Sequence, residues 1–169
     1  GCTLSSLAVG TMKGKECQQY ETRQGGVMRL ESLVNETTEA NLEKMKENPD
    51  IDPAEIQNTA EIIALAALKY GDLSNQATKD YIFDVSRFIE FEGNTGPYIL
   101  YTIVRIKSIL SRYGAAPSGK ITFTGEACEK QLMLKLSAFS QMVEEAYKEL
   151  APHKICAYIY ELANAFNSF

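Results

Sequence analysis

Three prolines, Pro53, Pro97 and Pro152, each stand at the start of a segment that reads as helical. Proline has a fixed φ and no amide hydrogen, so it fits the first turn of a helix and disrupts a helix interior. Asp52, directly before Pro53, is suited to cap the helix that follows. The chain is therefore expected to be divided into several helices that begin at these prolines.

The remaining segments fit the same class of fold. Residues 30–48 form an amphipathic pattern, and residues 126–150 read as one or two helices with a kink. A short helix or turn is expected around residues 83–91. Residues 1–30 are rich in Gly, Thr and Val, which is typical of short strands and a glycine-bearing loop. The sequence predicts a mainly α fold, a helical bundle with a small β-containing N-terminal piece.

Composition narrows the functional classes. The hydrophobic content of 45% and charged content of 23% are ordinary for a soluble domain. No apolar run approaches the roughly 18 residues that span a bilayer, and no basic region precedes the short apolar patch near residue 7. We expect a cytoplasmic protein without a membrane partner.

The cysteines and the histidine give little sign of a metal site. Four cysteines are scattered, none in a Cys-x-x-Cys pair, and His153 is the only histidine. A structural zinc site normally needs paired ligands at short spacing. We expect reduced, mostly buried thiols and no metal; a Cys–His pair that uses His153 stays open as a minor alternative.

Charge is distributed unevenly along the chain. The net charge is −5, yet residues 93–125 carry four cations and no Asp or Glu, whereas residues 1–92 carry −7 and residues 126–169 carry −2. Overall acidity argues against non-specific binding of nucleic acid. A local basic face is still compatible with a specific nucleic-acid partner.

Two predicted helices combine an apolar row with a polar one. The apolar rows are Ile99, Ile103, Ile106 and Leu110 in the first helix, and Ile155, Ile159, Leu162 and Phe166 in the last. The polar rows are Tyr101, Arg105, Ser108 and Arg112, and His153, Tyr160, Asn164 and Asn167. The first polar row suits a phosphate backbone, and the second can stack on unpaired bases and hydrogen-bond with them. Spacing alone favours a blander alternative, in which both rows are solvated helix faces and the arginines pair with acidic neighbours.

The loop "TRQGG", residues 22–26, has a similar ambiguity. Its glycines allow the backbone to approach a phosphate, and Arg23 could neutralise one. The alternative is that residues 22–26 form an ordinary hairpin turn, which favours the same residue types.

The order of the segments resembles one family. The stretch "YIFDVSRFIEFEGNTGPYILYTIVRIKSIL" closely resembles the junction of arginyl-tRNA synthetases, and "YETRQGGVMRLESLVNE" resembles their divergent class I signature loop. The end of the chain, "APHKICAYIYELANAFNSF", is similar to their helical anticodon-binding domain. The matching junction residues are Phe83, Asp84, Gly93, Asn94, Thr95, Gly96, Pro97, Tyr98, Tyr101, Arg105, Ile106, Ser108, Ile109 and Leu110.

The resemblance implies a division of the chain and a set of site residues. Residues 1–50 correspond to the edge of a catalytic domain, residues 51–92 to connecting helices, and residues 93–169 to a truncated anticodon-binding bundle. The implied tRNA contacts are Tyr101, Arg105, Arg112, Tyr160, Asn164 and Asn167. The implied ATP-binding loop residues are Thr22, Arg23, Gly25 and Gly26, with Arg23 as the catalytic cation.

The sequence also departs from the family pattern. The N-terminal His-x-Gly-His adenylation motif is not in it, because His153 is the sole histidine, and Glu21 stands where relatives often place Lys. The resemblance implies a piece of a longer arginine–tRNA ligase that uses ATP with Mg to attach arginine to its tRNA. For this piece we expect tRNA binding as a monomer, no cofactor and no activity alone. A helical protein-interaction module without an RNA role is the alternative from another class.

Overall fold

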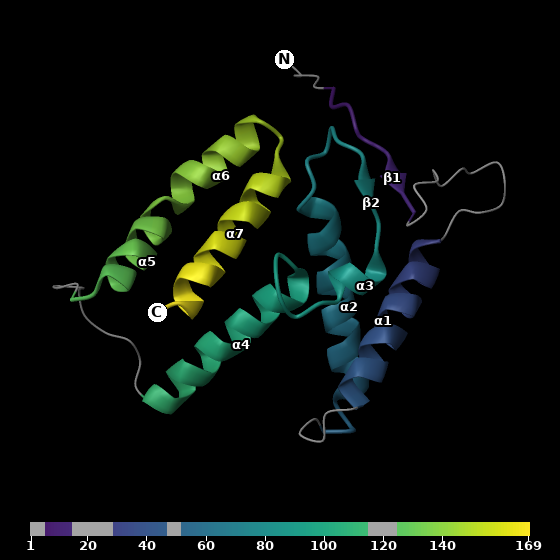
Figure 1. Ribbon diagram of the computed structural model, residues 1–169, viewed down its shortest axis with the longest axis horizontal. Coiled ribbons are helices and arrows are strands. Elements are labelled where there is room, and N and C mark those ends of the chain that lie inside the picture. The colour runs from purple at the N-terminus through teal and green to yellow at the C-terminus, as the bar shows by residue number, and fades with distance from the viewer. Residues whose placement is uncertain (1–5, 15–28, 47–51, 115–124) are drawn as a thin grey trace, which may run out of the picture.

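The structure, a computed structural model, describes residues 6–14, 29–46, 52–114 and 125–169, and its elements are mostly helical (Figure 1). In chain order they are β1 (Met12–Lys13), α1 (Leu30–Lys46), α2 (Ile56–Leu73), β2 (Tyr81–Ile82), α3 (Val85–Phe88), α4 (Gly96–Tyr113), α5 (Ala127–Ser137), α6 (Phe139–Lys148) and α7 (Pro152–Asn167). The expected mainly α fold with a small β-containing N-terminal piece is confirmed.

Helices α1 and α2 pack side by side (Figure 1). At their contact, Met45 of α1 clusters with Ala60 and Ile63 of α2. The buried face of α1 is partly polar, and Thr37 and Asn41 donate hydrogen bonds to carbonyls of their own helix, while Asn41 Oδ1 has no hydrogen-bond partner among the described residues. The Thr37 hydroxyl donates to the Leu33 carbonyl at 2.7 Å, and the Asn41 amide donates to the Thr37 carbonyl at 2.9 Å. Hydrogen bonds of this kind let polar groups enter a core without unpaired donors.

A short parallel sheet fastens the N-terminal segment to the middle of the chain. Met12 in β1 pairs with Tyr81 in β2. The Thr11 amide donates to Asp80 Oδ1 at 2.7 Å, and Lys13 Nζ lies 2.8 Å from Asp80 Oδ2. The backbones approach so closely that a Cβ on Gly10 would lie 2.2 Å from the Lys79 carbonyl oxygen.

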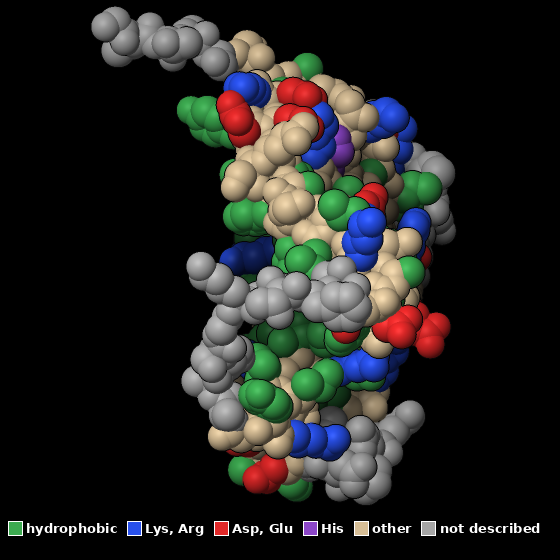
Figure 2. Space-filling view, turned by 90° about the vertical axis from the view of Figure 1, so that its left-hand side faces the viewer, with side chains coloured by type: hydrophobic (Ala, Val, Ile, Leu, Met, Phe, Trp, Pro, Cys, Tyr) green, Lys and Arg blue, Asp and Glu red, His purple; other side chains and the backbone are tan. Residues whose placement is uncertain are grey.

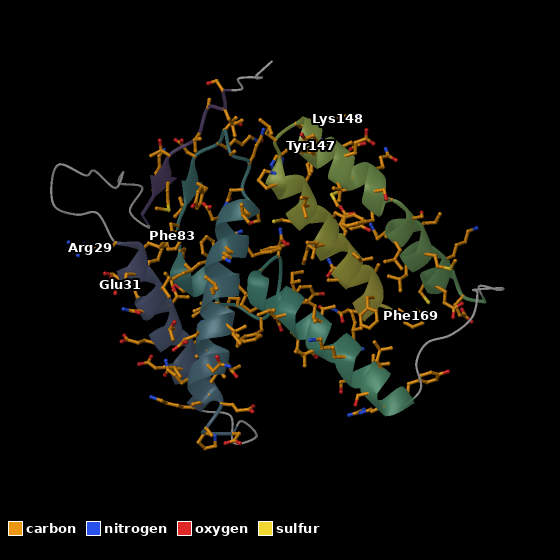
Figure 3. All side chains as sticks on the ribbon, turned by 180° about the vertical axis from the view of Figure 1, so that it is seen from behind. Arg29, Glu31, Phe83, Tyr147, Lys148 and Phe169 are labelled. Atoms are coloured by element: carbon orange, nitrogen blue, oxygen red, sulfur yellow. The ribbon has the colours of Figure 1, made fainter. Side chains whose placement is uncertain are left out.

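A small apolar core lies beneath this sheet. Leu33, Leu68 and Phe83 form its buried cluster. Phe83, labelled beside α1 in Figure 3, meets the ring of Phe88 edge to face, with ring centroids 5.0 Å apart. Phe83 and Phe88 therefore pack β2 and the short helix α3 against α1 and α2.

The turn before α4 is organised by Thr95. Its hydroxyl donates to the Glu90 carbonyl at 2.5 Å and accepts the Tyr98 amide at 3.3 Å, which caps the helix. Pro97 lies in the first turn, as expected, and the helix begins at Gly96. A Cβ on Gly96 would lie 2.3 Å from the Ala66 carbonyl oxygen, so α4 starts in direct contact with the backbone of α2.

The apolar row predicted as the buried stripe of α4 is only partly buried. Ile99 and Ile106 are half-buried, but Ile103 and Leu110 are 41% and 47% exposed. The prediction was wrong for these two residues. The buried residues of α4 all lie in its first half, and its second half runs out beyond α2 and α7 (Figure 1).

Helices α5 and α6 meet at Ala138, which is the kink that the sequence predicts. Both pack on α7, which also contacts α2 and α4. The Tyr158 hydroxyl of α7 donates to the Lys135 carbonyl of α5 at 2.8 Å. The most buried residues of α7 are the small Cys156 and Ala163, because neighbours press on this helix from two sides.

The apolar row predicted for α7 is less deeply placed than expected. Ile155, Ile159, Leu162 and Phe166 are all half-buried. Within the described residues, none of the helices has the length and apolar character that a membrane crossing requires.

Candidate functional site

Helix α4 carries a row of exposed polar side chains along one side. Tyr101 is 52% exposed, and Arg105, Ser108 and Arg112 are exposed as well. They recur at intervals of 4, 3 and 4 residues, which places them on one helix face. We call these four residues the α4 row. The sequence-predicted contacts Tyr101, Arg105 and Arg112 therefore lie together and are open to a partner.

Among the described residues, no ion pair with an acid neutralises the positive charge of α4. The ion pairs among the described residues involve Lys13, Lys44, Lys135, Lys148 and Lys154. None of those pairs involves Arg105, Lys107 or Arg112. The alternative in which the arginines of α4 pair with acidic neighbours therefore finds no such pair within the described part of the chain.

The side chains predicted on the face of α7 lie elsewhere than expected. Tyr160 packs against Tyr98 of α4, with ring centroids 5.7 Å apart. Asn164 Oδ1 accepts the Tyr98 hydroxyl at 2.7 Å. Tyr160, Asn164 and Asn167 are all half-buried, because α4 covers this side of α7. Tyr160 and Asn164 contact Tyr98, and Asn167 contacts Arg105 of the α4 row, so the three do not form a separate open face.

Asn167 connects the two helices most directly. Its amide nitrogen donates to the Tyr98 hydroxyl at 2.9 Å and to the Thr102 hydroxyl at 3.0 Å. Its Oδ1 accepts a hydrogen bond from Arg105 Nη1 at 3.1 Å. Sequence reasoning missed Tyr98 and Thr102 as partners. The signal was present in the spacing, since Tyr98, Thr102 and Arg105 follow each other at intervals of 4 and 3 residues.

A second polar contact lies where α2 meets this bundle. The Tyr70 hydroxyl lies within hydrogen-bond distance of Asn94 Oδ1, at 2.5 Å, and of the Cys156 carbonyl, at 2.8 Å. Burial raises the pKa of Tyr70, and the nearby Cys156 and Tyr160 add to this effect. Tyr70 therefore stays a neutral hydrogen-bonding group.

A cavity of about 550 Å³ opens beside this contact, between the end of α2, the sheet and α3. Lys13, Asp80 and Arg87 line it together with Asn94. The mixture of both charge signs gives it no clear preference for a ligand class. No motif in the sequence pointed to it.

The alternative of a Cys–His pair finds no support in the geometry. His153 Nδ1 is buried and has no hydrogen-bond partner among the described residues. Burial raises the pKa of the Cys156 thiol, which disfavours a nucleophilic thiolate. The loop residues predicted for ATP, Thr22, Arg23, Gly25 and Gly26, lie outside the described residues.

Two family models match successive parts of the chain. Residues 2–85 match the class I tRNA synthetase catalytic domain of the arginine type, and residues 99–169 match the DALR anticodon binding domain. The α4 row and α7 both lie in the second match. Strand β1, helices α1 and α2, and strand β2 lie in the first.

Curated arginine–tRNA ligases align with nearly the whole chain. The chain is 58% identical to an arginine–tRNA ligase of Agathobacter rectalis over 98% of its own length, and 54% identical to that of Alkaliphilus oremlandii over 99%. The chain spans 30% of the length of the first relative and 29% of the length of the second.

Solved structures agree in fold. The arginyl-tRNA synthetase of Thermus thermophilus superposes with a TM-score of 0.82 at 28% identity, over 96% of this chain and 26% of that one. The enzyme of Plasmodium falciparum gives a TM-score of 0.68 at 27% identity, over 85% of this chain and 26% of that one. With two domain models matched in order and close relatives along nearly its whole length, the chain belongs to the class I arginyl-tRNA synthetase family.

Proposed function

We propose that this chain is part of an arginine–tRNA ligase and that its α4–α7 half binds the tRNA. The observation that carries the proposal is the α4 row, an exposed set of side chains with two arginines that have no carboxylate partner among the described residues. It lies within the region that matches the anticodon-binding model. Arginine side chains with free N–H groups suit phosphate oxygens.

Within this half, Tyr101, Arg105 and Arg112 are the proposed direct contacts. Tyr101 offers an exposed ring on which a base can stack. Tyr160, Asn164 and Asn167 stay predicted contacts, and each keeps part of its surface open. Figure 2 views the molecule from the side and shows Lys and Arg side chains among hydrophobic ones, with Asp and Glu side chains between them.

For the whole ligase we propose ATP-dependent attachment of arginine to its tRNA by way of arginyl-adenylate. The loop with Thr22, Arg23, Gly25 and Gly26 would hold ATP with Mg, and Arg23 would stabilise the negative charge of the phosphates. We keep the division into 1–50, 51–92 and 93–169 as a proposal, together with a cytoplasmic monomer. The comparisons give the alternative of a protein-interaction module no support.

Binding of an arginine tRNA transcript to the 169-residue chain tests this proposal. A filter-binding titration at several salt concentrations should give binding that weakens as salt rises, because phosphate contacts release counterions. Arg105→Ala and Arg112→Ala should each weaken binding and reduce the magnitude of the salt slope by about 0.7 to 0.9. Affinity no greater than that for an unrelated tRNA would count against specific recognition by this segment.

Lys148→Ala is the matched control. Lys148 is an exposed cation on α6 that pairs with Glu144 at 2.7 Å, and Figure 3 shows it at the end of the molecule away from α4. Its loss removes the same formal charge without touching the α4 row. An equal loss of binding in this variant would mean that net charge, and not the α4 row, governs the interaction.

A further inference from the structure

We infer that Asn167 is a positioning residue for Arg105, and that it fixes the guanidinium on the α4 row in the orientation that contacts a phosphate. This inference rests on the proposed function. The contact runs from the last residue of α7 to the middle of α4 and measures 3.1 Å. No described carboxylate makes an ion pair with Arg105, so the Asn167 amide is its hydrogen-bond acceptor within the described structure.

The orientation of the Asn167 amide is fixed by its other partners. Its nitrogen donates to the hydroxyls of Tyr98 and Thr102. The Tyr98 hydroxyl donates its own proton to Asn164 Oδ1, and the Thr102 hydroxyl donates its proton to the Tyr98 carbonyl. If the amide were flipped, Asn167 Oδ1 would face the Tyr98 and Thr102 hydroxyl oxygens, neither of which has a proton left to donate to it. Oδ1 must therefore point at Arg105.

The chemistry of the pair explains why an amide is useful here. An uncharged acceptor holds one N–H of the guanidinium and leaves its positive charge and its remaining donors free. A carboxylate in the same place would hold the guanidinium equally well but would cancel its charge. Thr102, whose hydroxyl accepts a hydrogen bond from the Asn167 amide, is only 3% exposed. The Asn167 amide is therefore held by a buried residue, while Arg105 is exposed to solvent.

This role makes the three relevant substitutions distinguishable. Asn167→Ala frees the arginine but keeps its charge, so affinity for the tRNA should fall about 2- to 10-fold, the usual cost of ordering one long side chain, with the salt slope unchanged. Asn167→Asp adds a competing anion, so both affinity and the magnitude of the salt slope should fall as in Arg105→Ala. The double variant Arg105→Ala/Asn167→Ala should bind no worse than Arg105→Ala.

The experiment is a filter-binding titration of the 169-residue chain with an arginine tRNA transcript across a salt series, with urea unfolding of every variant. Ser168→Ala is the control, because Ser168 is exposed and follows Asn167 directly, and within the described part of the chain its hydroxyl bonds to the Asn164 carbonyl alone. It should bind as the parent chain does. A comparison of each variant at conditions where it is fully folded separates binding from stability.

The outcomes separate this inference from the proposed function. If the parent chain shows no salt-sensitive binding, the proposed function fails and the positioning role fails with it. If the parent binds and Arg105→Ala weakens it, while Asn167→Ala binds normally or its effect adds fully to that of Arg105→Ala, only the positioning role is overturned. The positioning role is also overturned if Asn167→Ala loses affinity and Asn167→Asp binds the tRNA with the same affinity as Asn167→Ala.

Discussion

The hydroxyl oxygen of Tyr70 in α2 lies 2.8 Å from the carbonyl oxygen of Cys156 in α7, and 2.5 Å from Asn94 Oδ1 in the turn before α4. Residues 2–85 and 99–169 match different domain models, so Tyr70 reaches from the catalytic-type part to the anticodon-binding part. A hydroxyl has one proton, so Tyr70 donates to one of these oxygens at a time. One side chain thus couples the two parts.

Replacing Tyr70 with Phe removes this coupling and little else. We expect a loss of about 0.5 to 1.5 kcal/mol in the free energy of unfolding, the usual net worth of a hydrogen bond. Urea unfolding measures it. Tyr101→Phe is the control, because the Tyr101 side chain is 52% exposed, and its effect should stay within about 0.5 kcal/mol. Equal effects of the two substitutions would argue against the coupling.

Gly10→Ala should detach the N-terminal segment. The new methyl group would lie 2.2 Å from the Lys79 carbonyl oxygen, and the Gly10 amide donates to the Ala77 carbonyl at 2.7 Å. Because backbone must move to relieve this overlap, we expect a destabilisation of about 1 to 3 kcal/mol. Val9→Ala, at a side chain that is 77% exposed, should change the stability little. A fully stable Gly10→Ala protein would show that β1 shifts at no cost.

The pairing of Lys13 with Asp80 predicts a dependence of stability on pH. The hydrogen bond from Lys13, followed by that from the Thr11 amide, lowers the pKa of Asp80 below its ordinary value of 3.8. A depressed pKa in the folded state contributes stability above the ordinary value and loses it as pH falls through the folded-state value. Asp80→Asn should therefore be less stable than the parent chain near pH 6.

The test is the difference in unfolding free energy between the two proteins at several pH values. The difference should shrink as the pH drops below about 4, where the unfolded carboxyl begins to take up its proton. A difference that stays constant down to the lowest pH would show that Asp80 acts through its shape and not through its charge.

The two described cysteines should react at different rates. Cys156 is 6% exposed, and burial raises the pKa of its thiol, so little thiolate is present at neutral pH. Cys128 is half-buried. In the native chain at pH 7.5, iodoacetamide should label Cys128 before Cys156, as peptide mass mapping reports. The reverse order would mean that α7 opens more readily than its packing indicates.

Local rules carried the prediction of the helices. Pro97 and Pro152 mark helix starts because the proline ring acts within one turn, and α4 and α7 begin within one residue of them. These two starts depend on short-range sterics that a sequence displays directly. The helix expected at Pro53 with Asp52 as its cap begins only at Ile56, with Glu55 at the N-cap. A kink was expected within residues 126–150, but its position at Ala138 was not predicted.

The site was harder to predict because it depends on which helices meet. Periodicity placed Asn164 and Asn167 on one face of α7 but does not reveal that α4 covers that face. The same limitation explains Ile103, which belongs to an apolar row and is nevertheless 41% exposed where α4 leaves its neighbours. Thr37 and Asn41 are buried in α1 because they bond to their own helix, which apolar periodicity alone does not predict.

The parallel pair of β1 and β2 has a consequence for the order of synthesis. Met12 pairs with Tyr81, and Thr11 with Asp80, across 69 positions of the chain. On a ribosome the earlier strand emerges first and stays without its partner while α1 and α2 are made, at a rate of about 5 to 20 residues per second. For several seconds the nascent chain therefore exposes an unpaired strand edge, and closing the sheet is a late event that depends on the helices between the strands.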